Sequence, residues 1–292
     1  MFEGFTRRRV AVEGAEINLV HGGSGPPLLL LHGYPQTHAI WHMMAPRLAE
    51  HFTVVCADLR GYGDSSKPEA GVDCVNYSKR VMAADQVQVM KALGFARFSV
   101  AGHDRGGRVG HRLAADHPDA IDRLCVIDIA PTLHMYRNTT EDFARAYWHW
   151  FFLILPPPLP ERMIGSDPDA FWRAKCGDGA AGLAPFTDAA IGEYLRCFRD
   201  PQAIHASCND YRAAAGIDLE HDRADVAGGR RLGCPLLVLW GAHGVVERCF
   251  DPIAAWGERA VNVSGSALPG GHYLPEELPH ATGDALIRFL QA

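Results

Sequence analysis

The chain has 292 residues, of which 48% are hydrophobic, and a formal net charge of −6. This length allows one large domain or two small ones, and the apolar content allows a substantial core. The acidic balance argues against nucleic acid as a partner, because nucleic-acid binding favours a basic patch. No stretch approaches the roughly 20 apolar residues that span a bilayer.

The N-terminus and the cysteines indicate the cellular compartment of the protein. Residues 1–9 have no apolar segment behind their arginines, so we expect no secretory signal and a cytoplasmic protein. The eight cysteines show no C-x-x-C spacing, and Cys56 and Cys125 lie inside strand-like runs. They are typical of reduced, small hydrophobic residues, and we expect neither a disulfide framework nor a metal site.

Short apolar runs alternate with helical patterns along the chain, which predicts a mostly parallel sheet covered on both faces. The first two runs, separated by Gly14 and Ala15, indicate an antiparallel hairpin. The predicted strands are residues 8–13, 16–21, 27–31, 52–57, 97–102, 123–128, 234–240 and 259–264. The predicted helices of this α/β section are residues 40–50, 77–93, 105–117 and 276–291.

About a hundred residues between strands 123–128 and 234–240 contain no convincing strand and are rich in aromatic side chains. We expect residues 134–220 to form an inserted helical cap over the carboxyl edge of the sheet, where ligands bind in open α/β sheets. Residues 1–133 and 221–292 then form the α/β core.

The most informative motif is Gly102-His-Asp-Arg-Gly106, which directly follows an apolar run. A strand that leads into Gly-x-nucleophile-x-Gly is the elbow that holds a nucleophile on a strained turn. The usual serine is replaced by Asp104. A carboxylate suits displacement at an sp3 carbon, because attack on a carbonyl would give a labile anhydride, and the alkyl ester it forms must be cleaved by water. The alternative is that Asp104 only caps the next helix.

His272 lies in a glycine-rich loop before the last predicted helix, in the chain order nucleophile, acid, histidine of the α/β-hydrolase fold. It is the candidate base. Asp128 ends strand 123–128 and is the candidate acid, since a carboxylate there can orient the imidazole and stabilise its charged form. Asp251 and Glu247 remain alternatives for the acid.

Tyr34 follows strand 27–31, in the place of an oxyanion loop, where its backbone N–H would act together with that of Arg105. Arg105 and Arg108 lie one turn apart at the start of a helix, where cations oppose the helix dipole at about 0.3–1 kcal/mol each. Such a pair forms a fork for a planar carboxylate, and it would offset repulsion from Asp104 of roughly 4 kcal/mol at 4 Å and an effective dielectric of 20. Alternatively, Asp104 pairs with one of them, or Arg108 forms a surface ion pair.

The cap supplies His149 and Trp150 from Tyr147-Trp-His-Trp, and Tyr211. Imidazole and indole N–H and phenol O–H are donors of the kind that a leaving halide needs. An aromatic cluster by itself is more often core than site.

Together these residues resemble the fluoroacetate dehalogenases of the α/β-hydrolase fold, over essentially the whole chain. The motifs that carry the resemblance are His32-Gly-Tyr-Pro-Gln36, Gly102-His-Asp-Arg-Gly-Gly-Arg108, Asp128, His149-Trp150, Tyr211 and Gly271-His272. Haloalkane dehalogenases look similar but usually have Trp where this chain has Arg105. One departure is Tyr34, where the fluoroacetate dehalogenases often have Phe.

The resemblance implies a cofactor-free homodimer that converts 2-haloacids such as fluoroacetate or chloroacetate to 2-hydroxyacids. It assigns the nucleophile to Asp104, the base to His272, the acid to Asp128, the carboxylate clamp to Arg105 and Arg108, and the halide pocket to His149, Trp150 and Tyr211. One rival is an epoxide hydrolase, in which Tyr147, Tyr194 or Tyr211 would protonate the epoxide oxygen. Another is a ligand-binding pseudoenzyme, in which loss of a catalytic residue would be expected.

Overall fold

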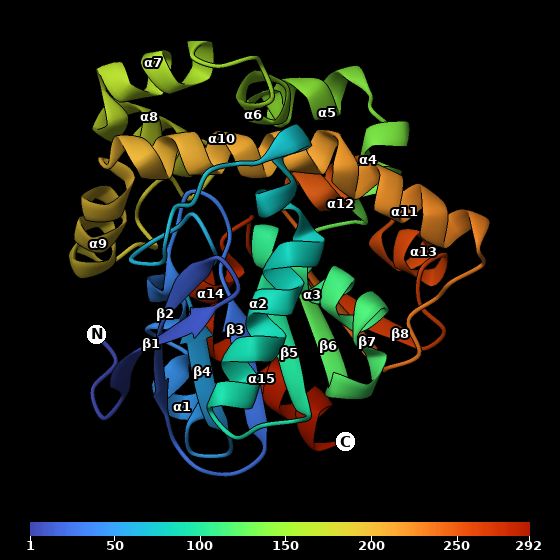
Figure 1. The fold of residues 1–292 in the computed structure, drawn as a ribbon. Helices are drawn as coiled ribbons and strands as arrows, with labels where there is room; N and C mark the ends of the chain where they lie inside the picture. The colour runs from blue at the N-terminus through green and yellow to red at the C-terminus, as the bar shows by residue number, and fades with distance from the viewer.

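An eight-stranded sheet forms the centre of the computed structural model, which describes residues 1–292 (Figure 1). The strand order is β1-β2-β4-β3-β5-β6-β7-β8. β1 pairs antiparallel with β2, and β2 with β4, whereas all other neighbouring strands are parallel. The mostly parallel sheet and its N-terminal hairpin are therefore confirmed. The strands are β1 (Thr6–Val12), β2 (Ala15–Gly22), β3 (Pro27–Leu31), β4 (Thr53–Ala57), β5 (Phe98–His103), β6 (Ile121–Ile127), β7 (Leu236–Gly241) and β8 (Val263–Leu268).

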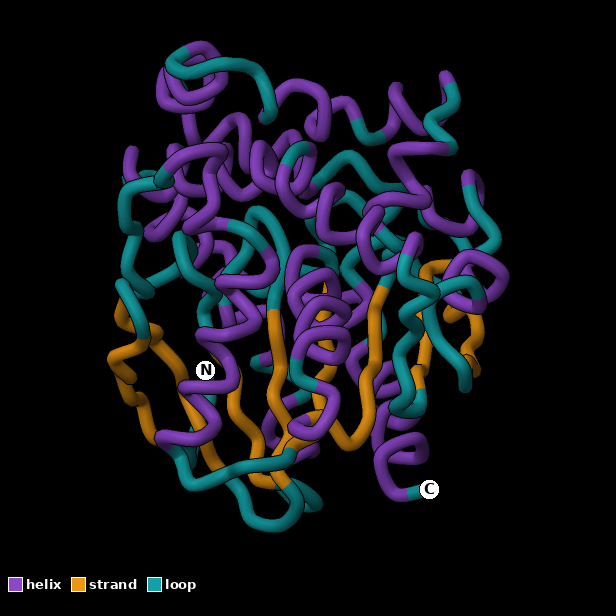
Figure 2. The backbone as a smooth tube through the Cα atoms, turned by 45° about the vertical axis from the view of Figure 1, so that its right-hand side comes forward, coloured by secondary structure: helices purple, strands orange, loops and turns teal.

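The two faces of the sheet bury separate hydrophobic clusters, because successive side chains of a strand point to opposite faces. In β3, Leu29 and Leu31 pack with α2 (Lys79–Ala92) and α3 (Arg105–Asp116). Leu28 and Leu30 pack with α1 (Ala45–Leu48) and α15 (Pro279–Gln291) on the other face. Figure 2 shows helices on both sides of the strands. The fully buried parallel strands explain why their sequences are continuously apolar.

Eight helices between β6 and β7 lie over the carboxyl edge of the sheet, at the top of Figure 1. They are α4 (Thr132–Arg137), α5 (Glu141–Ala146), α6 (Trp148–Leu153), α7 (Leu159–Ser166), α8 (Pro168–Cys176), α9 (Asp188–Phe198), α10 (Pro201–Ala215) and α11 (Ile217–Ala227). The division of the chain into a core and a 134–220 cap stays a prediction, and both of its boundaries fall inside helices, α4 and α11.

Prolines account for two differences from the predicted helices. Residues 40–50 form η1 (His38–Trp41) and α1, which restarts around Pro46, and residues 276–291 divide into α14 (Leu274–Glu277) and α15, which begins at Pro279. Proline fits the first turn of a helix but not its interior. The remaining elements are η2 (Val72–Tyr77), η3 (Pro118–Ala120), α12 (Val245–Cys249) and α13 (Pro252–Gly257).

The last predicted strand, 259–264, is displaced in the structure. The strand β8 begins at Val263, and Ala260 makes only an isolated bridge with Leu232. The prediction followed the apolar residues Ala260 and Val261, whereas β8 itself contains serine and glycine and is largely exposed at the edge of the sheet.

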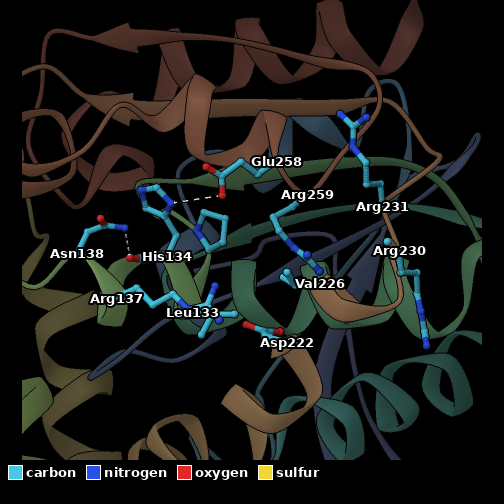
Figure 3. A pocket seen from close by; sticks show the side chains of 12 residues that line it. Leu133, His134, Arg137, Asn138, Asp222, Val226, Arg230, Arg231, Glu258 and Arg259 are labelled. Atoms are coloured by element: carbon cyan, nitrogen blue, oxygen red, sulfur yellow. Dashed lines mark hydrogen bonds and ion pairs between the residues drawn. The ribbon is translucent and has the colours of Figure 1, made fainter. Parts of the chain in front are cut away.

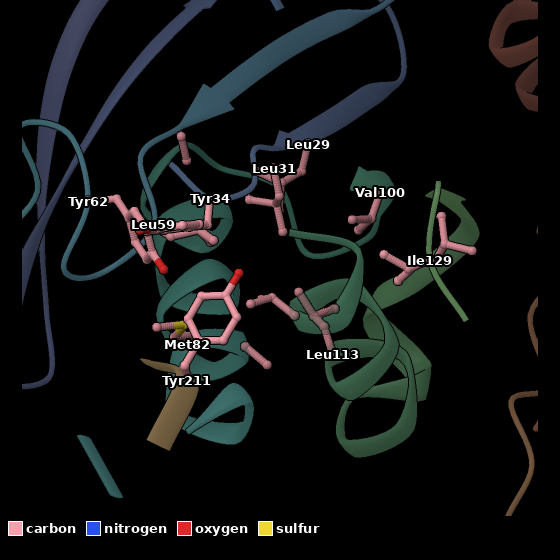
Figure 4. Packing of buried hydrophobic residues seen from close by; sticks show 14 of the residues in the cluster. Leu29, Leu31, Tyr34, Leu59, Tyr62, Met82, Val100, Leu113, Ile129 and Tyr211 are labelled. Carbon is pink, nitrogen blue, oxygen red and sulfur yellow. The ribbon is translucent and has the colours of Figure 1, made fainter. Parts of the chain in front are cut away.

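The helices over the sheet pack directly onto the core. Tyr211 of α10 belongs to the same buried cluster as Tyr34, Leu31 and Met82, and Figure 4 shows its ring beside them. Trp172 of α8 is fully buried, and its indole N–H donates to the Pro35 carbonyl at 2.9 Å. No helix of the structure is both long and apolar enough to cross a membrane.

Candidate active site

Asp104 lies at the sharp turn between β5 and α3. Its φ of 47° falls in the left-handed region that side chains other than glycine rarely adopt. A Cβ at Gly102 would overlap the backbone of Gly106, and one at Gly106 would overlap the Leu31 carbonyl. The glycines therefore let β5, α3 and β3 approach closely enough to form this turn. The Asp104 side chain makes no capping hydrogen bond to α3, so the helix-cap alternative does not account for it.

The Asp104 carboxylate is buried and ionised. The backbone N–H of Tyr34 donates to its Oδ1 at 3.0 Å, as expected of an oxyanion loop, whereas the structure has no corresponding bond from the Arg105 N–H. Burial alone would raise the pKa of Asp104, but the charges of His272, Arg105 and Arg108 outweigh burial and hold that pKa well below its usual range. The carboxylate is thus available as an anion at neutral pH.

His272 and Asp128 form a direct pair. His272 Nδ1 lies 2.6 Å from Asp128 Oδ2, and the Gly241 N–H donates to the other oxygen, Oδ1, at 3.0 Å. Burial opposes the charged imidazole, but the hydrogen bond and the charge of Asp128, with that of Asp104, raise the pKa of His272 above its usual value. Since Nδ1 faces Asp128, the Nε2 atom is left for proton transfer.

The two alternative acids have other partners. Asp251 accepts a hydrogen bond from the Ala254 N–H at 2.9 Å and so caps α13. Glu247 accepts from the indole N–H of Trp240. Neither carboxylate contacts His272, and Asp128 is the acid that the geometry favours.

Arg105 is held by a carboxylate that the sequence analysis did not identify. Its Nε and Nη2 donate to the two oxygens of Asp210, each at 2.8 Å, and its guanidinium lies 4.2 Å from the centre of the Tyr211 ring. Tyr62 and Lys79 also bind the Asp210 carboxylate. The alternative that Asp104 pairs with an arginine is wrong, because Asp210 does so instead.

Arg108 is equally buried but is held by neutral groups. Its Nη1 donates to the Ala130 carbonyl at 3.1 Å and to the Thr132 hydroxyl at 2.9 Å, and its guanidinium lies 4.7 Å from the centre of a Trp150 ring. Burial and the charge of Arg105 lower its pKa. It is 3% exposed and forms no ion pair, so the surface-ion-pair alternative is wrong.

Four buried nitrogens of the predicted carboxylate clamp and halide pocket have no hydrogen-bond partner. They are Arg105 Nη1, Arg108 Nε, His149 Nδ1 and Trp150 Nε1. Burial holds the pKa of His149 far below its usual value, so its ring is neutral and has one N–H. The aromatic rings connect the group, since the Tyr211 ring centre lies 5.9 Å from that of His149 and 6.5 Å from that of Trp150. Unsatisfied buried donors are rare and call for an acceptor.

Asp104 and His272 share a small cavity of about 40 Å³. Its other lining residues include Tyr34, Tyr147, His149, Lys175 and Asp178. The predicted site residues Arg105, Arg108, Trp150 and Tyr211 do not line it. One water needs about 10–15 Å³ of such space. The cavity therefore suits a ligand of a few heavy atoms rather than a long chain.

A family model of the α/β-hydrolase fold matches residues 26–256, which include Asp104 and Asp128. The chain belongs to the α/β-hydrolase family. In the order that this family uses, Asp104 follows β5, Asp128 follows β6 and His272 follows β8.

The chain is similar over its whole length to characterised members of this family. It is 50% identical to a fluoroacetate dehalogenase from Burkholderia sp, over 99% of this chain and 95% of that protein. It is 34% identical to a soluble epoxide hydrolase from Corynebacterium sp. (strain C12), over 97% and 96%. The solved structure of an α/β hydrolase from Nostoc sp PCC 7120 superposes with a TM-score of 0.97 at 54% identity, covering 99% of both chains.

Three further residues of this α/β hydrolase contribute to the site without having been assigned a role from the sequence. His103 packs against the His272 ring at 4.7 Å between ring centres, and burial together with the His272 charge lowers its pKa to about 3. Lys175 lines the cavity from α8, and Asp210 holds Arg105. His103 and Asp210 lie beside predicted site residues in the sequence, which was the one available signal, whereas nothing in the sequence marks Lys175. No group of three or more His, Cys, Asp or Glu side chains is arranged to hold a metal ion.

Proposed function

We propose that the protein hydrolyses the carbon–halogen bond of small 2-haloacids such as fluoroacetate or chloroacetate, releasing halide and a 2-hydroxyacid. The observation that carries this proposal is the set of four buried nitrogens without partners, one of them on His149, which lines the same cavity as the anionic Asp104. A substrate carboxylate and a departing halide are both anions, and both would accept hydrogen bonds from such donors. The 50% identity to a fluoroacetate dehalogenase supports the same activity.

The substrate is held by two groups of residues. Arg105 Nη1 and Arg108 Nε keep free N–H groups, and these bind the carboxylate of the haloacid and offset its repulsion from Asp104. His149, Trp150 and Tyr211 donate to the halogen. Asp210 is a positioning residue in this scheme, because it binds the Nε and Nη2 edge of the Arg105 guanidinium and leaves Nη1 free.

The first step is a displacement at the α-carbon. Tyr34 holds Oδ1 of Asp104, which leaves Oδ2 to attack. A carbon–oxygen bond forms to the α-carbon, the carbon–halogen bond breaks, and the halogen departs with the bonding electrons as halide. A chiral α-carbon is inverted. The product is an ester between Asp104 and the remaining acid.

The second step is hydrolysis of this ester. His272 Nε2 takes a proton from water as the water oxygen attacks the carboxyl carbon of Asp104, and Asp128 stabilises the resulting imidazolium. Negative charge develops on the oxygen that the Tyr34 N–H contacts. The intermediate then collapses, the 2-hydroxyacid leaves with a proton from His272, and the Asp104 carboxyl group releases the remaining proton of the water to solvent, which regenerates the carboxylate. For fluoroacetate the product is glycolate.

Epoxide hydrolysis is the second candidate, because Tyr147 lines the cavity together with Asp104 and His272, and the chain is 34% identical to a soluble epoxide hydrolase. Tyr147 and Tyr211 would protonate the epoxide oxygen, whereas the Tyr194 hydroxyl is used by Glu276 at 2.9 Å. This reaction has no use for two buried arginines with free N–H groups. A pseudoenzyme is disfavoured, because nucleophile, base and acid are all present.

The test is halide and diol release from fluoroacetate, chloroacetate and styrene oxide under matched conditions. We expect halide release from a haloacetate and little or no diol. The carboxylate clamp is tested with Arg108→Met. This change should raise the activation free energy that governs kcat/KM for chloroacetate by about 2–5 kcal/mol, and that for neutral chloroacetamide much less. Diol formation without halide release, or equal losses on both chloro compounds, would favour the epoxide reaction instead.

We also propose that the enzyme is cytoplasmic, from its N-terminus and cysteines, and a homodimer, from the family resemblance. Exposed apolar side chains on α6 and α7, among them Trp148, Leu159 and Met163, offer a surface for such contact. Light scattering coupled to size-exclusion chromatography measures the assembly directly, and a monomeric mass at micromolar concentration would reject it.

A further inference from the structure

A second cavity lies away from Asp104, on the far side of α4 and α11. Its volume is about 330 Å³, and it lies between α4, the C-terminal end of α11 with the loop after it, and the residues that follow α13. Figure 3 shows it from close by. None of its lining residues belongs to the proposed dehalogenase machinery.

Arginines dominate the charge of this cavity. Arg137, Arg230, Arg231 and Arg259 line it, against only two carboxylates, Asp222 and Glu258. Asp222 is already neutralised from behind, since its Oδ1 accepts from Arg112 at 2.7 Å. A protein with a formal net charge of −6 thus concentrates positive charge at one hollow.

Arg259 is the central residue of the cavity. It is 8% exposed, yet its guanidinium makes no hydrogen bond, and its nearest carboxylate oxygen, on Asp225, lies 3.9 Å away. That same oxygen accepts from Arg112 at 2.7 Å. Asp225 is shared, because its other oxygen pairs with Arg230 at 3.2 Å. A guanidinium stays charged at any physiological pH, and that of Arg259 leaves its N–H groups free to bind an anion.

A second guanidinium faces the first across the cavity. Figure 3 shows Arg137, from α4, and Arg259 pointing toward the middle of the hollow, whereas Arg231 points away. The Nη2 of Arg231 donates to the carbonyl of Gly257 at 2.7 Å and also to that of Ala260. Arg137 forms no ion pair. Two planar guanidinium groups that point into the same cavity can donate hydrogen bonds to the oxygens of a phosphate or carboxylate.

We propose that this cavity binds a small organic dianion, either a phosphate monoester or a dicarboxylate, between Arg137 and Arg259. A dianion neutralises the two facing guanidinium groups, and a volume of this order accommodates an organic molecule rather than a bare ion. The site is separate from the carboxylate clamp at Arg105 and Arg108, and it stands whether or not the protein is a dehalogenase.

The test is isothermal titration calorimetry on the full chain at low ionic strength, with phenyl phosphate and succinate as probes. We expect saturable binding of at least one probe. Arg259→Met keeps the length of the buried stem and removes the charge, and should weaken binding at least about tenfold, since charge-assisted hydrogen bonds are the strong ones. Arg137→Met changes an exposed side chain and should weaken binding as well, even if Arg259→Met does not fold.

Arg162→Met is the matched control, because Arg162 is an exposed arginine of α7 outside the cavity. It should leave the dissociation constant within about twofold, as surface charges contribute little. Binding of phenyl phosphate alone identifies a phosphate monoester site, and binding of succinate alone a dicarboxylate site. Absence of binding by both probes overturns the proposal, as does binding that survives both Arg137→Met and Arg259→Met.

Discussion

The proposed active site has two parts that differ in how far their polar groups are satisfied. In the first part, Asp104 accepts from the Tyr34 N–H, and His272 is bonded to Asp128, which accepts from the Gly241 N–H. In the second part, His149 and Trp150 have nitrogens without partners. Under the proposed mechanism, the groups that form and cleave the ester are already hydrogen-bonded, whereas those that hold anions would find their partners only in a substrate.

Replacing His272, which belongs to the first part, should have the largest effect on turnover. His272→Asn removes the general base, which contributes about 10²–10⁴-fold in enzymes, while leaving the displacement step intact. Turnover should stop after the first step, and incubation with chloroacetate should add the mass of a carboxymethyl group to the peptide that contains Asp104. Peptide mass spectrometry makes the measurement, with Asp104→Ala as the control that gains nothing. An adduct on another peptide would show that Asp104 is not the nucleophile.

Asp128→Asn should have the next largest effect. It keeps the shape but removes the charge that supports the His272 imidazolium, and the corresponding change in a Ser-His-Asp triad lowers kcat about 10⁴-fold. We expect a loss of at least about 10²-fold in ester hydrolysis, followed as halide release over many turnovers. Asp251→Asn is the control, since Asp251 only caps α13. An inactive Asp251→Asn enzyme beside an active Asp128→Asn enzyme would reverse the assignment.

Trp150→Phe tests the unsatisfied part alone. It keeps much of the packing and deletes one N–H, and a lost donor of this kind can remove about 2.7–4 kcal/mol of transition-state stabilisation. Fluoride is the most compact and strongly hydrogen-bonding of the halides, so its release should fall by about 10²–10³-fold while chloride release falls less. The measurement compares fluoride release with chloride release by the variant, which tests whether the Trp150 N–H contacts the departing halide. Equal losses would mean that Trp150 only packs the cap.

The smallest effect concerns pH. The pKa of His272 is raised, so the neutral base is lost as pH falls through that value, whereas the pKa of Asp104 is held far below its usual range. Ester formation should stay nearly constant between about pH 5 and 8, and ester hydrolysis should decline toward the acidic end. Forming the ester removes the charge of Asp104, which is one cause of the raised pKa of His272. The pKa of His272 should therefore be lower in the ester intermediate than in the free enzyme. Quenched-flow experiments measure the rates of ester formation and ester hydrolysis separately. A parallel decline of both rates toward acidic pH would contradict this prediction.

The sequence was most informative where covalent geometry leaves few choices. Asp104 could be placed at an elbow because Gly102 and Gly106 admit no side chain there, and the strands β3 to β7 could be recognised because buried parallel strands are continuously apolar. The pairing of Arg105 with Asp210 could not be predicted, since it joins α3 to α10 across 105 positions of the chain and depends on tertiary packing. The arginine cavity likewise gathers residues from separate segments, none of which shows a motif.

The buried carboxylate of Asp210 has a consequence for how molecules enter and leave. It lies on α10 and is bound by Arg105, Tyr62 and Lys79, all from the α/β core. Lifting α10 off the sheet would strand these charges in a region of low dielectric, at a cost of about 3–5 kcal/mol for a broken buried pair. We therefore expect reactants to exchange through local movement of side chains that line the cavity, such as Lys175 and Asp178, rather than through a slow swing of the whole helical layer. With the helical layer fixed in this way, only small molecules would reach the cavity of about 40 Å³.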